Sequence, residues 1–101
     1  MALISDLVQF VLQKTKDGKL QWEVLGDDFY QAPIGDNVVT IDSQRRTYSF
    51  TVRNSLGQIV DRLDAVFGEG DILESLFNMA RRQALKTDEI LEDMMTNLRK
   101  L

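Results

Sequence analysis

The spacing of hydrophobic residues divides the chain into helical and extended segments. Between Leu3 and Lys16, apolar residues recur every three or four positions, which is typical of an amphipathic helix. Asp17-Gly18 follows and favours the end of that helix, because glycine readily adopts the left-handed conformation of a C-terminal cap. From Leu20 onward apolar and polar residues alternate, as expected for strands with one face turned to a core.

The alternation predicts four strands, or five if the segment 59–63 is also extended. The clearest strand is Thr47 to Arg53, where Tyr48, Phe50 and Val52 point to one side. The others are centred on segments 20–24, 30–34 and 39–42, with predicted turns at 35–37, 42–45 and 54–57. Such short connections favour hairpins, so we expect an antiparallel meander. Pro33 indicates that the second strand lies at an edge or carries a bulge.

Two helices are predicted after the strands. Gly68-Glu69-Gly70 interrupts the alternation, and Asp71 with Glu74 begins a helix that runs to about Leu85. Thr87 is the expected N-cap of a last helix that continues to the C-terminus. The order of helix, strands and two helices predicts a single α+β domain, residues 1–101, with the helices packed on one face of the sheet. The polar strand positions are expected to face away from the helices and to be solvated: Thr40, Thr47, Ser49, Thr51 and Arg53.

Composition narrows the classes of partner. The chain has 101 residues, 44% of them hydrophobic, which suits one core. Its 12 basic and 16 acidic residues give a formal charge of −4, which disfavours nucleic acid and anionic membrane surfaces as partners. No stretch of about 18 apolar residues predicts a membrane-spanning helix, and the run from Met1 to Leu12 lacks the basic start of a signal peptide. A cytoplasmic protein is expected.

The chain contains neither cysteine nor histidine. This excludes thiolate and imidazole nucleophile systems and removes the commonest transition-metal ligands. We therefore expect no catalytic residue, no metal and no cofactor. The preferred interpretation is a non-enzymatic protein-interaction module, able to self-associate through the apolar end of the last helix, namely Met94, Met95, Leu98 and Leu101. Packing of that helix in the core explains the same stripe.

The alternative is a small-ligand sensor or an enzyme, with a pocket between the sheet and the helices. Its candidate binding residues are Arg81, Tyr30 and Tyr48. Arg81 lies at the border of the predicted buried face, so it is also a candidate to pair with a carboxylate of Asp6, Asp17 or the last helix. Arg82 is expected to be free in solvent. The sole tryptophan, Trp22, is expected in the core, since it alternates with Leu20 and Val24.

Two signatures carry a resemblance to known proteins. The first is Lys14-Thr15-x-x-Gly18-x-Leu20-x-Trp22, and the second is Leu73-x-x-Leu76-Phe77-x-x-Ala80-Arg81-Arg82-x-Ala84. Together they resemble a group of small uncharacterised bacterial proteins with an N-terminal helix, several strands and an alanine-arginine helix near the end. The resemblance implies a bacterial, cytoplasmic source and the α+β order of elements, and it implies no activity.

Overall fold

The computed structural model describes residues 3–68 and 71–101, and it has the α+β order predicted from the sequence. Glu69 and Gly70, in the predicted connection before the second helix, lie outside the described residues. The elements in chain order are α1 (Leu3–Lys16), β1 (Glu23–Gly26), β2 (Phe29–Ile34), β3 (Asn37–Gln44), β4 (Thr47–Arg53), β5 (Ile59–Val66), α2 (Asp71–Ala84) and α3 (Thr87–Arg99).

The five strands form an antiparallel meander in the order β1-β2-β3-β4-β5, which confirms the predicted topology. Their register aligns one core row across the sheet. Ile41 of β3 pairs with Tyr30 of β2 and with Phe50 of β4, and Phe50 pairs in turn with Leu63 of β5. Since side chains alternate along each strand, this row faces the helices, and Ile41 and Phe50 are completely buried.

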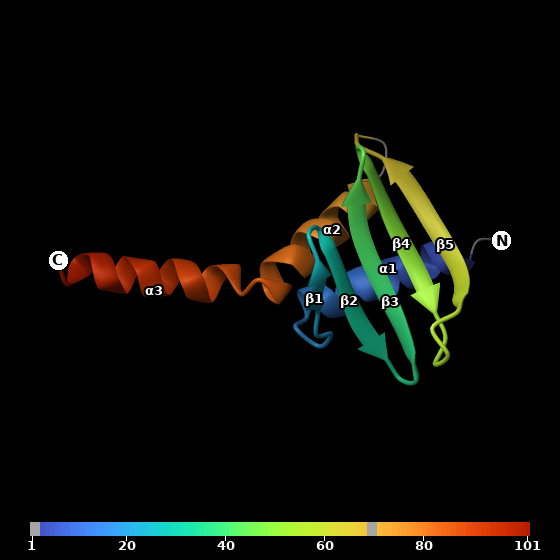
Figure 1. Ribbon diagram of the computed structural model, residues 1–101, viewed down its shortest axis with the longest axis horizontal. Coiled ribbons are helices and arrows are strands. Elements are labelled where there is room, and N and C mark those ends of the chain that lie inside the picture. The colour runs from blue at the N-terminus through green and yellow to red at the C-terminus, as the bar shows by residue number, and fades with distance from the viewer. Residues whose placement is uncertain (1–2, 69–70) are drawn as a thin grey trace.

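Helices α1 and α2 cover one face of this sheet (Figure 1). Helix α2 supplies most of the helical core through Leu73, Leu76, Phe77 and Ala80, all buried. Helix α1 contributes Val8 and Val11 and packs beside α2. The single core is thus made by one sheet face and two helices, which is the two-layer arrangement expected for this order of elements.

Helix α3 differs from the expectation that both C-terminal helices pack on the sheet. It projects away from the body of the molecule, and its free end lies far from the strands (Figure 1). The long axis of the molecule consequently measures 56 Å, against 31 and 24 Å for the other two. The apolar stripe of α3 predicted burial, but this helix has no buried residue.

Three features of the sheet also differ from the predicted ones. Strand β1 covers Glu23–Gly26, later than the predicted segment 20–24. Strand β2 is an inner strand, although Pro33 had indicated an edge or a bulge. The irregular pairing lies between Val24 and Gly26 of β1, and β1 pairs with β2 only as far as Gln31, so Pro33 needs no bond on that side. The turn between β3 and β4 is formed by Arg45 and Arg46, later than predicted, because β3 continues through Gln44.

Candidate functional site

Helix α3 is set apart from α2 by one residue with unusual backbone geometry. Lys86 has φ 55° and ψ 43°, a left-handed conformation that a residue with a side chain seldom adopts. It ends the helical path of α2 and starts α3 in a new direction. Thr87 is therefore the first residue of α3 rather than its predicted N-cap. Lys86 occupies the cap position without a side-chain hydrogen bond, and its carbonyl oxygen accepts from the backbone N–H of Ile90 at 3.0 Å.

An ion pair spans the junction between α2 and α3. The guanidinium of Arg82 donates to the carboxylate of Asp88, and both side chains are more than half exposed. The prediction that Arg82 is free in solvent was therefore wrong. The change of direction at Lys86 brings the two residues together although they are six positions apart, a spacing that does not meet on a continuous helix. Because both groups are solvated, the pair adds little to stability.

One side of α3 carries a row of exposed apolar side chains, which we call the apolar stripe. Each member is at least half exposed, and they are Ile90, Leu91, Met94, Met95, Leu98 and Leu101. Their spacing of one, three and four residues places them on one side of the helix. A contiguous apolar surface of this kind costs free energy in water and is typical of an interaction site.

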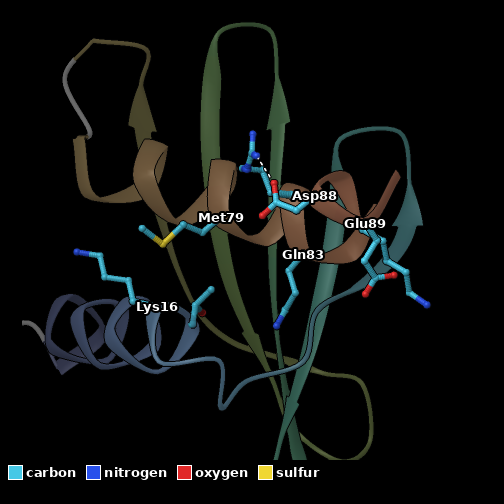
Figure 2. A pocket seen from close by; sticks show the side chains of 8 residues that line it. Lys16, Met79, Gln83, Asp88 and Glu89 are labelled. Atoms are coloured by element: carbon cyan, nitrogen blue, oxygen red, sulfur yellow. Dashed lines mark hydrogen bonds and ion pairs between the residues drawn. The ribbon is translucent and has the colours of Figure 1, made fainter. Parts of the chain in front are cut away.

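A surface hollow of about 480 Å³ lies at the base of α3, where it meets the ends of α1 and α2 (Figure 2). Helix α3 contributes Asp88 and Glu89 to its wall, and the other lining residues are Thr15, Lys16, Met79, Arg82, Gln83 and Lys86. No residue of the apolar stripe lines the hollow: at 100° per residue Glu89 lies opposite the centre of the stripe, and Asp88 lies beside its edge at Met95. The hollow and the stripe are therefore separate surfaces. The hollow is lined by three basic side chains, Lys16, Arg82 and Lys86, and by the two acidic ones of α3, so it offers no single charge to a ligand.

The wall of the hollow is fixed by hydrogen bonds to the buried Trp22, whose predicted place in the core is confirmed. The indole Nε1–H of Trp22 donates to the Thr15 hydroxyl at 3.0 Å, and that hydroxyl donates to the carbonyl of Val11 at 2.8 Å. The side chain of Gln83 bonds to the backbone of the Leu20–Trp22 segment. Gln83, which lies between Arg82 and Ala84 in the second sequence signature, thus connects that signature to the first.

The outer face of the sheet is polar, as predicted, but it is not fully solvated. Thr40, Ser49 and Thr51 are 2%, 5% and 5% exposed. They lie on the inner strands β3 and β4, where each is flanked by residues of both neighbouring strands. Arg62 of β5, for example, donates to the Ser49 hydroxyl at 3.2 Å and to Asp64 at 2.9 Å.

Two carboxylates on this face have shifted pKa values of opposite sign. Burial raises the pKa of Asp42, and the positive charge of Arg62 only partly offsets that effect. The pKa of Asp64 is lowered by a hydrogen bond with the Ser49 hydroxyl and by its bond with Arg62. The face therefore holds ionised groups bonded to one another, with none of the deep enclosure that small-molecule sites need.

The three candidate binding residues fall in two different environments. Tyr30 and Tyr48 are buried, and both rings pack against Phe77, at centroid distances of 5.7 and 5.3 Å. Burial raises the pKa of the Tyr48 phenol, and the charge of Glu74 adds to the shift. Arg81 is exposed on α2 and makes no ion pair among the side chains that the structure describes. Neither the hollow at the base of α3 nor a second one beside Phe10 on α1 is lined by any of the three. Their role in ligand binding stays a prediction.

Within the described ranges, no group of three or more carboxylates is placed to hold a metal ion. In those same ranges no helix combines the length and the apolar character needed to cross a bilayer. Comparison of the chain with models of known protein families, with curated proteins and with solved structures finds no match. The chain is therefore classed by its fold alone, as an α+β domain from which helix α3 projects.

Proposed function

We propose that this chain is a non-enzymatic protein-interaction module that self-associates through α3. The observation that carries the proposal is the apolar stripe, which lies on a helix that points away from its own core. A helix of this kind, exposed on all sides, is held in place by little within its own chain. A second helix laid on the stripe would remove the apolar side chains from water, as in helix-to-helix recognition generally.

The energetics favour a weak, reversible contact. Full burial of a leucine or methionine side chain is favourable by about 1.5–3 kcal/mol, so half-exposed ones gain roughly 1 kcal/mol each. The five stripe side chains from Leu91 to Leu101 of each of two copies give roughly 10 kcal/mol, against an association cost of about 4–15 kcal/mol. The net value corresponds to a dissociation constant in the micromolar range or weaker.

The composition supports an interaction role over catalysis. Without cysteine and histidine, the chain lacks the groups that most often act as nucleophiles and general bases near neutral pH. Its net charge of −4 favours protein over nucleic acid as the partner. The methionines of the stripe suit an interface, because their flexible side chains adapt to different packing.

Sedimentation over a range of concentrations, from low to high micromolar, tests the proposal. We expect the average mass to rise with concentration for the unchanged chain. Leu98→Glu should return it to the monomer mass, because a carboxylate in the stripe would lose its water on association. Thr96→Glu is the matched control, since it places the same charge on the polar side of the same helix and should leave the mass unchanged. A chain that stays monomeric at every concentration would overturn the proposal.

A further inference from the structure

The order of charges along α3 indicates how a second copy would lie on the apolar stripe. Resting on the proposed self-association, we propose that two α3 helices pair antiparallel, with Leu91 level with Leu101 of the second copy and Met94 level with its Leu98. In this register Glu92 and Asp93, the acidic pair, lie level with Arg99 and Lys100, the basic pair, of the second copy.

The charges of α3 are segregated along its axis. Its first half contains Asp88 and Glu89 followed by the acidic pair, and the basic pair comes at its end. Two such helices side by side attract when they run in opposite directions, since each acidic half then lies beside a basic end. The helix dipoles favour the same orientation.

Each charged pair also places one member beyond each edge of the apolar stripe. Glu92 and Arg99 are seven residues apart and so lie on one flank of α3, and Asp93 and Lys100 lie on the other flank by the same spacing. In an antiparallel pair of identical helices, each flank meets the same flank of the second copy. Opposite charges therefore approach at the same level on both sides of the contact.

Two competing arrangements bring like charges together. A parallel, in-register pair places each acidic pair beside the acidic pair of the second copy. An antiparallel register in which Leu91 is level with Met94 of the second copy places Glu92 level with Asp93 and Arg99 level with Lys86. The proposed register is free of these repulsions, so charge favours it over both.

The proposed register also leaves room for the two domains. The overlap extends from Leu91 to Leu101, about 15 Å of helix at 1.5 Å per residue. It uses the half of the arm that lies farthest from the sheet (Figure 1). The two copies of Thr87 would then lie roughly 27 Å apart along the axis, so the domains extend from opposite ends of the contact.

Charge reversal distinguishes the antiparallel from the parallel pair. Glu92→Lys with Asp93→Lys would place four positive charges on each α3, each new lysine level with an arginine or lysine of the second copy. We expect self-association at least tenfold weaker at low salt. Adding Arg99→Glu and Lys100→Glu to the same chain should restore it. A parallel pair predicts no weakening by the first variant, because acidic residues that face each other would be replaced by lysines that face each other.

Distances between spin labels give the second test, and the natural absence of cysteine allows labels at single introduced sites. In the proposed register Thr96→Cys lies level with its own counterpart, whereas two Glu89→Cys sites are offset by roughly 21 Å along the axis. We therefore expect the label distance at position 89 to exceed that at position 96 clearly. Equal label distances at positions 89 and 96, in a dimer that Leu98→Glu dissociates, would overturn the antiparallel register but leave the proposed function standing. A chain that is monomeric under all conditions would overturn both the antiparallel register and the proposed self-association, and would indicate that the stripe binds another protein.

Discussion

Gln83 of α2 holds the backbone of Trp22 against the helix layer with two short hydrogen bonds. Its side-chain oxygen accepts from the backbone N–H of Trp22 at 2.8 Å, and its side-chain nitrogen donates to the carbonyl oxygen of Leu20 at 2.8 Å. Gln83 is thereby joined to residues that lie 61 and 63 positions earlier in the chain, and the segment that leads into β1 is attached to the end of α2. This contact supports the base from which α3 projects.

The first prediction concerns this contact. Gln83→Leu would leave the N–H of Trp22 and the carbonyl of Leu20 without partners in a partly buried place, which costs about 2 kcal/mol and lowers Tm by roughly 10 °C. Thermal unfolding followed by the fluorescence of the single tryptophan measures the change. Gln21→Leu removes an exposed amide in the same region and should leave Tm nearly unchanged. Equal Tm values for both variants would show that the two bonds do not matter.

A second prediction concerns the hydroxyl between α1 and the indole. Thr15→Val keeps the shape of the side chain but removes the acceptor for the buried indole N–H of Trp22. The free energy of unfolding should fall by about 1–2 kcal/mol, since the donor stays buried without a partner. Urea unfolding measures this. Thr15→Ser retains the hydroxyl and should behave nearly as the unchanged chain. A Thr15→Val chain as stable as the unchanged one would show that this hydrogen bond contributes nothing to stability.

Much of the fold could be predicted because helices and strands repeat their apolar residues with different periods. Tyr48, Phe50 and Val52 alternate strictly, and their strand was predicted with its observed ends. The end of β3 was missed because Ser43 and Gln44 carry no apolar signal, although both pair with β4. A period indicates which face of an element is buried, but it contains no information on where a strand of polar residues stops.

The arrangement of the candidate site was harder to predict from sequence. The apolar end of α3 was visible in Met94 and Leu98, but the same stripe suits a buried helix equally well. What decides between the two is the left-handed backbone of Lys86, and neither glycine nor asparagine marks that position. The bond between Arg82 and Asp88 depends on the same residue, so its prediction required the direction of α3 to be known.

A third prediction concerns the turn between β3 and β4. Arg45 and Arg46 have φ values of 49° and 64°, which residues with side chains adopt at a cost of about 1–2 kcal/mol. Turns of this kind prefer asparagine followed by glycine. Arg46→Gly should therefore raise the free energy of unfolding by about 0.5–1 kcal/mol, after the greater freedom of glycine in the unfolded chain is subtracted. The carbonyl of residue 46 would still accept from the backbone N–H of Phe67.

Chemical denaturation of Arg46→Gly measures that gain. Gly35→Ala is the converse control, because Gly35 has φ 61° in the turn between β2 and β3. It should lower stability by about 1 kcal/mol. A destabilised Arg46→Gly chain would mean that the arginine side chain itself stabilises the turn.

The last prediction concerns two aspartates on the outer face of the sheet. Burial raises the pKa of Asp42 above its ordinary value of 3.8, so its ionised form is less favourable in the folded chain than in the unfolded one. Asp42→Asn should therefore stabilise the chain at neutral pH, and the gain should fade as the pH falls through the folded pKa toward 3.8.

Asp64 has a lowered pKa because the Ser49 hydroxyl and Arg62 bond to its carboxylate. Its ionised form stabilises the fold above the ordinary pKa, and this contribution is lost as the pH falls through the folded value. Asp64→Asn should thus destabilise the chain at neutral pH, with the loss disappearing in acid. Urea midpoints for both variants, measured from neutral pH to below 3.8, should move in opposite directions relative to the unchanged chain. Shifts of the same sign would contradict this account of the outer face.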